Sequence, residues 1–154
     1  MAFNFRKSVT FQLGQASKAY RSRSGSYLAN MSMHPGQEAV LKTLSEADGL
    51  TMGQLAAQLS VRPPTIAKTV NRLTSQGLVL RSESKEDGRL VQVALTEEGR
   101  DLLGQLDKSW KRLEREALAG LDDKDRKKLR KLLKQVEKNL TRDAVSTSSD
   151  AKQK

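Results

Sequence analysis

The fold of this chain is decided by residues 51–77, which read TMGQLAAQLSVRPPTIAKTVNRLTSQG. The first four residues, Thr51–Gln54, match a capping box. In this motif the side chains of a Thr and of a Gln three residues later accept backbone N–H groups at the start of a helix. A second helix opens at Pro63-Pro64, where a missing N–H costs least, and Gly77 is its expected terminator. The stretch therefore predicts two short helices joined by a tight connection at residues 60–62.

The second of these helices has two chemically different sides. Ile66, Val70 and Leu73 recur at i, i+4 and i+7 and form one apolar stripe that holds the helix against a core. An α-helix fits the major groove of B-DNA, and its exposed N-terminal side chains reach base edges there. The pattern predicts a DNA recognition helix, because its other side carries the hydrogen-bond donors Thr65, Lys68, Thr69 and Arg72.

Two predicted strands follow Gly77 and complete a winged helix-turn-helix. Residues 79–83 and 90–95 have the composition of strands, and the second strand alternates Val91, Val93 and Leu95. The charged tip between the strands contains the turn signal Asp87-Gly88. We expect Arg89 to enter the minor groove, where narrow A·T tracts attract cations. Asp87 is then expected to pair with Arg89 and to orient it.

The predicted DNA contacts divide by role. Base readout is expected from Thr65, Lys68 and Thr69, with Arg62 as a further candidate, and phosphate contacts are expected from Arg72 and Lys85. The full set of candidate DNA-binding residues is Arg62, Pro64, Thr65, Lys68, Thr69, Arg72, Arg81, Lys85, Asp87 and Arg89.

Helices are also predicted on both sides of this region. Periodicity indicates helices over residues 4–28 and 35–47, a long helix after the N-cap Thr96, and a last helix after the N-cap Asp122. The apolar stripes of the first and last helices have no place in a three-helix winged head, and an isologous interface with a second copy would cover them. The predicted fold is therefore mainly α with a small β-hairpin wing: a winged helix-turn-helix region at 35–100, a helical dimerisation region made of 4–34 and 101–142, and a disordered tail at 143–154.

Charge and composition narrow the function without deciding it. The net charge is +10, which favours a polyanionic partner. Much of the excess lies in residues 108–142, where a solvated helix face explains it equally well.

The absence of Cys and the single His disfavour disulfides, thiol chemistry and a zinc site, and no Gly-rich phosphate loop or nucleophile–base pair is present. We therefore predict a protein that is not an enzyme, with no catalytic residues, metal or cofactor. Because no apolar run approaches about eighteen residues, we also predict a cytoplasmic protein with no membrane partner.

Five segments of the sequence form a recognisable set in this order and at these spacings: Leu50–Ala56, Pro63–Leu73, Gly77–Val79, Asp87–Arg89 and Leu95–Gly99. With this set the sequence closely resembles the MarR family of bacterial transcription regulators, over about residues 5–141. The resemblance implies an obligate homodimer with entwined first and last helices, a pseudo-palindromic operator, usual action as a repressor, and release by a small aromatic or anionic effector. In the family the recognition helix and a wing Asp-x-Arg contact DNA, at the positions of Thr65, Lys68, Thr69, Arg72, Asp87 and Arg89.

Two departures from the family pattern matter. Arg62 stands where the family commonly has a Ser that caps the recognition helix, which removes a side-chain acceptor worth about 1 kcal/mol and adds a possible phosphate or guanine contact. The missing cysteine makes the thiol switch of the family's peroxide-sensing branch unavailable.

Candidates for an effector pocket are Tyr20, Tyr27, Gln37 and Trp110, since ligand sites often have an aromatic wall between helices. For Trp110, packing in the core or in a dimer interface is the competing interpretation.

Two other functions stay open at this point. One alternative is an architectural DNA-binding protein, which would use the same basic winged helix-turn-helix regions to bind DNA with weak sequence specificity. A winged helix can also bind protein, but such a module would carry an apolar outward face on the recognition helix, and this sequence has donors there.

Overall fold

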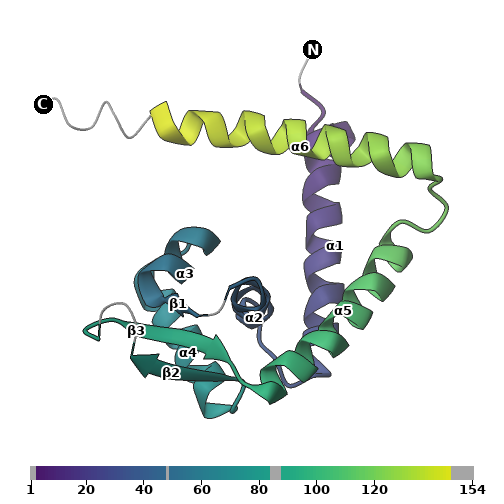
Figure 1. The fold of residues 1–154 in the computed structure, drawn as a ribbon. Coiled ribbons are helices and arrows are strands. Elements are labelled where there is room, and N and C mark those ends of the chain that lie inside the picture. Colours follow the sequence, from purple (N-terminus) through teal and green to yellow (C-terminus); the bar gives the residue numbers. More distant parts are fainter. Residues whose placement is uncertain (1–2, 48, 84–87, 147–154) are drawn as a thin grey trace, which may run out of the picture. The chain divides into compact units, whose positions relative to one another are not determined.

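The computed structural model describes residues 3–47, 49–83 and 88–146, with side chains of the last helix described as far as residue 142. The chain divides into two compact units, Met1–Leu113 and Glu114–Lys154, which we call the first and second units. Within the described residues the protein is mostly helical and has one small antiparallel sheet (Figure 1), which confirms the predicted fold class.

The first unit contains every strand and most of the helices of the described chain. Its elements in chain order are η1 (Phe5–Lys7), α1 (Val9–Ala29), α2 (Gln37–Ser45), β1 (Leu50–Thr51), α3 (Met52–Leu59), α4 (Pro63–Ser75), β2 (Val79–Glu83), β3 (Val91–Leu95) and α5 (Glu97–Ala117), of which α5 continues into the second unit.

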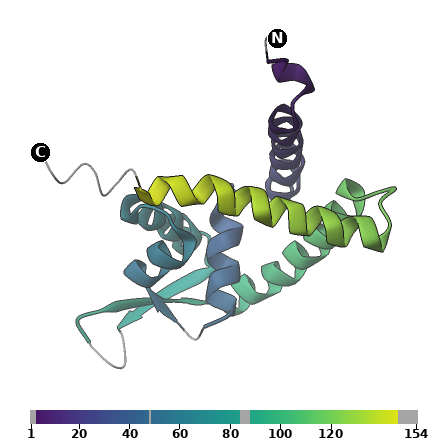
Figure 2. The ribbon, with the colours of Figure 1, turned by 90° about the horizontal axis from the view of Figure 1, so that it is seen from above.

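The sheet has the strand order β1-β3-β2, with both pairs antiparallel. Strands β2 and β3 match the predicted hairpin and project to one side of α2, α3 and α4 (Figure 2). Strand β1 was not predicted, because two residues are too few to show a period of two. Its Leu50 pairs with Val93 of β3 and so attaches the start of α3 to the sheet.

The core of the first unit is built from the predicted apolar stripes. Ile66, Val70 and Leu73 of α4 are buried, as the spacing predicts, together with Leu41 of α2 and Leu55 of α3. The alternation expected in β3 holds for Val93 and Leu95 but is wrong for Val91, which is 47% exposed. Val91 pairs with Glu83 at the end of the ribbon nearest its turn, beyond the reach of the core.

Two predicted helices are shorter than expected. The first begins at Val9 instead of residue 4, because the Ser8 side chain accepts the N–H of Phe11 at 3.1 Å and caps it there. The second occupies Gln37–Ser45 instead of 35–47. Gly36 precedes it with φ of +95°, a left-handed conformation that ends any helix running through Pro35.

The second unit consists of the end of α5 and the helix α6 (Asp123–Ser146). Asp122 caps α6 as predicted, because its Oδ1 accepts the N–H of Asp125 at 2.8 Å. The Arg126 guanidinium donates to the carbonyls of Leu121 and Leu118 at 2.9 and 3.2 Å, which fixes the turn after α5. Helix α6 continues to Ser146, four residues past the predicted end of the helical region at residue 142, because residues 143–146 contain neither Gly nor Pro to stop the helix.

None of the helices in the described residues is long and apolar enough to cross a membrane.

Candidate nucleic-acid interface

The connection between α3 and α4 positions the candidate recognition helix. Helix α3 starts with the predicted capping box: Thr51 Oγ1 accepts the N–H of Gln54 at 3.2 Å, and Gln54 Oε1 accepts the N–H of Thr51 at 2.8 Å. Ser60 then takes a left-handed conformation at φ +52° and turns the chain sharply. This turn lets α4 begin three residues later, with both α3 and α4 packed on the same core.

The start of α4 offers few free backbone donors. Pro63 and Pro64 occupy its first two positions and have no N–H, and the next N–H, from Thr65, donates to the Arg62 carbonyl at 3.0 Å. Arg62 provides no side-chain cap, as its identity predicts. Binding of a phosphate by the helix N-terminus is therefore weak here, and the side chains of α4 must supply most of the contacts.

The outward side of α4 carries the predicted donors. Thr65, Lys68 and Arg72 are exposed, on the side away from the buried stripe of Ile66, Val70 and Leu73. Thr69 is half-buried, and its hydroxyl donates to the Thr65 carbonyl at 2.9 Å. In this state Thr69 presents an acceptor oxygen and a methyl group, which suit a base amino group or a thymine methyl.

The hairpin is fastened to the recognition helix by a polar contact. The Arg81 guanidinium on β2 donates to Asn71 Oδ1 on α4, so Arg81 lies beside the helix and not at the tip. Asn71 is a positioning residue that the pattern of donors alone does not single out. Arg89 is exposed at the entry to β3, while Lys85 and Asp87 lie outside the described residues, so the expected pairing of Asp87 with Arg89 stays a prediction.

The far end of α4 is held by a chain of amide hydrogen bonds. Gln37 is 1% exposed; its Nε2 donates to Gln76 Oε1 at 2.8 Å, and Gln76 Nε2 donates to the Ser32 carbonyl at 3.0 Å. The His34 N–H donates to Gln37 Oε1 at 2.8 Å. The chain links the α1–α2 connection to the end of α4. Helical spacing indicates that Gln37 is buried, because it shares one side of α2 with Val40, Leu41 and Leu44, but it does not indicate the partners of the Gln37 amide.

Replacing Gln37 by leucine tests this linkage. Gln37→Leu keeps the buried volume but removes two hydrogen bonds, so we expect it to lower the free energy of unfolding by about 1–3 kcal/mol in urea denaturation. Gln58→Leu, at an exposed position of α3, is the matched control and should change stability by no more than about 0.5 kcal/mol. Equal losses from the two variants would contradict a structural role for the Gln37 amide.

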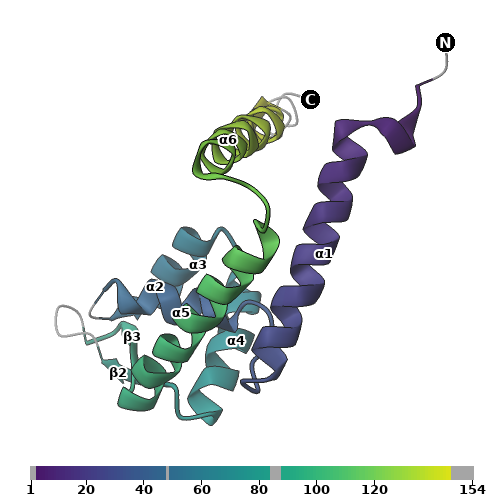
Figure 3. The same cartoon turned by 90° about the vertical axis from the view of Figure 1, so that its right-hand side faces the viewer.

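The four candidates for an effector pocket fall into separate places. Tyr27 of α1 and Trp110 of α5 line one small space of about 10 Å³, where the C-terminal end of α1 lies beside α5 (Figure 3). The guanidinium carbons of Arg23 and Arg112 lie 5.3 and 5.7 Å from the centre of the Tyr27 ring. Tyr20 is exposed and does not line this space, and Gln37 belongs to the amide chain described above.

Comparison with known proteins gives consistent matches. The sequence profile of the MarR family matches residues 33–91. A probable transcriptional regulator from Pseudomonas aeruginosa of known structure is 31% identical, with a TM-score of 0.76 over 86% of this chain and 99% of that one. A mutant MarR from E. coli, solved in complex with operator DNA, is 25% identical, with a TM-score of 0.76 over 88% of this chain and 99% of that one. The putative transcriptional regulatory protein for the hcr operon of Thauera aromatica is 28% identical over 77% of this chain and 71% of its own length.

The profile match covers the part of the first unit in which the capping box, the recognition helix and most of the hairpin are found. The similarity to the Pseudomonas aeruginosa regulator extends well beyond that part, over nearly all of that protein. The chain therefore belongs to the MarR family of transcriptional regulators.

Proposed function

We propose that the protein is a sequence-specific DNA-binding regulator that acts as a repressor, binds a pseudo-palindromic operator as a homodimer, and is released by a small effector. The observation that carries the proposal is the division of α4 into a fully buried apolar stripe and an outward side with the exposed donors Thr65, Lys68 and Arg72. A rigid helix with such a side is what major-groove readout requires.

Exposed apolar side chains on α1 and α6 support the homodimer. Val9 of α1 is 81% exposed, and Leu140 of α6 is 69% exposed. Leu132 and Leu133 of α6 are also exposed. Large apolar side chains at helical spacing favour a partner surface, and an isologous two-fold interface covers the same side chains in both copies. Such a dimer presents two recognition helices to two half-sites.

Selection of duplexes from a random pool tests this function. The purified protein should enrich an inverted repeat whose half-sites lie about one helical turn, 10 base pairs, apart. Light scattering should show two protomers per selected duplex. A pool that gains no common sequence after repeated selection would favour the architectural interpretation, and a single protomer on each duplex would exclude the two-headed mechanism.

The surroundings of Tyr27 support a small aromatic anion as effector. The site offers the Tyr27 and Trp110 rings together with the positive charges of Arg23 and Arg112. The space of about 10 Å³ holds no more than about one water, so an effector has to favour a state in which α1 and α5 are further apart. It then lowers DNA affinity by its preference for that state.

The single tryptophan makes this effector site testable. Titration with benzoate and related aromatic carboxylates should change the emission of Trp110 over the same concentrations that release a fluorescent operator duplex. Release of DNA with unchanged Trp110 emission would place the effector elsewhere, and a change in emission without release would separate binding from regulation.

A further inference from the structure

Helix α6 has a strongly basic face on the side opposite its apolar seam. Lys127, Lys131, Lys134 and Lys138 recur at i, i+4, i+7 and i+11, and Arg130 lies beside them. The apolar residues Leu129, Leu133, Val136 and Leu140 follow the same spacing two residues later, which is about 200° around the helix. A second copy that covers the apolar seam therefore leaves the four lysines in solvent, whereas Arg130 lies at the edge of the seam near Leu129 and Leu133. We call these five cations the basic face of α6.

The charges of this face are not compensated by the protein. All five cations are exposed, and in the part of the chain that the structure describes none of them has an ion pair or side-chain hydrogen bond. The remaining lining residue, Gln135, donates to Asn139 Oδ1 at 2.7 Å. An ion-pair network on the surface of α6 therefore does not explain why lysines recur along this face.

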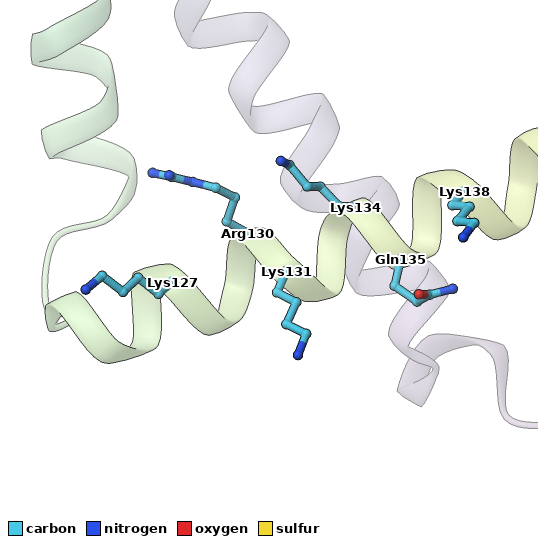
Figure 4. Close-up of a pocket in the computed structure, with 6 residues that line it drawn as sticks. All are labelled: Lys127, Arg130, Lys131, Lys134, Gln135 and Lys138. Atoms are coloured by element: carbon cyan, nitrogen blue, oxygen red, sulfur yellow. The ribbon is translucent and has the colours of Figure 1, made fainter.

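The geometry of the side chains fits an extended ligand better than a small ion. Figure 4 shows the cations fanning out along α6, with Arg130 and Lys134 to one side and Lys131 to the other, so they do not converge on one point. From Lys127 to Lys138 the helix advances by about 16 Å at about 1.5 Å per residue. A duplex carries about ten phosphate charges over that length.

We propose that the basic face of α6 is a second DNA-binding surface, which contacts the phosphate backbone of duplex DNA without reading its sequence. This proposal rests on one part of the proposed function, namely that the protein binds duplex DNA. Contacts of this kind raise the affinity for every sequence by the same factor, because phosphates carry no base information. The recognition helix then determines the sequence, and the basic face of α6 raises the salt dependence of binding.

The test measures affinity for a random-sequence duplex against salt concentration. A variant with Lys127→Gln, Lys131→Gln, Lys134→Gln and Lys138→Gln keeps strong helix formers in α6. Each lost phosphate contact lowers the slope of log affinity against log salt by about 0.9, so the slope should fall by about 3–4. The ratio of affinities for selected and random duplexes should not change.

Three comparisons make the result decisive. The first is a variant with Lys7→Gln, Lys18→Gln, Lys42→Gln and Lys108→Gln, which removes the same charge from exposed positions elsewhere. The second changes the four α6 lysines to arginine and should keep the wild-type slope. The third replaces DNA by polyglutamate, which should bind far more weakly at the same salt.

The proposal is overturned if the α6 glutamine variant keeps a slope within about one of wild type. It is also overturned if the control variant loses as much slope, or if polyglutamate binds as well as DNA. These outcomes leave the proposed function intact, whereas a wild-type protein that fails to bind any duplex would overturn the proposed function itself.

Discussion

Gly99→Ala is expected to lower the free energy of unfolding by about 3 kcal/mol and the melting temperature by roughly 10 °C. Gly99 lies in the first turn of α5, where a Cβ atom would be 2.1 Å from the Leu78 carbonyl oxygen and 3.3 Å from Leu95 Cδ2. The backbones meet here because the Thr96 N–H donates to the same carbonyl at 3.2 Å. An added methyl group therefore pushes α5 away from the base of the hairpin.

Gly104→Ala is the matched control on the same helix. Nothing lies within 4 Å of a Cβ atom at Gly104, so this substitution should raise stability by about 0.5–1 kcal/mol through its better helix propensity. Thermal and urea denaturation of the two variants measure the difference. Two variants of equal stability would show that α5 does not approach Leu78 as closely as described.

The double variant Lys68→Ala, Arg72→Ala should lose about 100-fold or more in affinity for a selected duplex. Each contact to a base edge contributes about 1–3 kcal/mol, and a phosphate contact adds to that. Both side chains are exposed on α4, so the fold should tolerate their removal. Fluorescence anisotropy with a labelled duplex at fixed salt gives the affinities.

A control variant is needed to show whether the α4 variant binds DNA more weakly because it loses charge or because it loses the DNA-contacting side of α4. Lys18→Ala, Lys42→Ala removes the same charge from exposed positions of α1 and α2, and its affinity should stay within a few-fold of wild type. If this control weakened binding as much as the α4 variant, the recognition helix would have no special role.

Most of the winged head could be predicted from sequence because its signals are local. The Thr51–Gln54 capping box, the two prolines opening α4 and the stripe of Ile66, Val70 and Leu73 each act within a few residues, and the structure contains all of them. The same holds for the caps at Thr96 and Asp122, whose oxygens accept N–H groups three residues later.

Features that join distant segments could not be predicted in this way. The approach of Gly99 to Leu78, the contact of Arg81 with Asn71 and the amide chain through Gln37 and Gln76 each depend on tertiary packing. Each of them braces α4 or the hairpin. The sequence pattern therefore predicts residues that contact DNA, whereas the structure adds residues that hold those contacting residues in position.

The DNA-contacting role of the named residues remains a prediction. Of the ten, the structure places Thr65, Lys68 and Arg72 on one exposed side of α4, ties Arg81 to that helix, and leaves Lys85 and Asp87 outside the described residues. Among the candidates for an effector site, it brings together only Tyr27 and Trp110.

The central claim is that the winged head discriminates between DNA sequences. It is tested most directly by titrating the wild-type protein against a selected duplex and a scrambled duplex of equal length and composition, at one fixed salt concentration. Sequence-specific regulation predicts a ratio of affinities of at least about 1,000. A ratio near one would contradict the account and identify the protein as a binder of DNA in general.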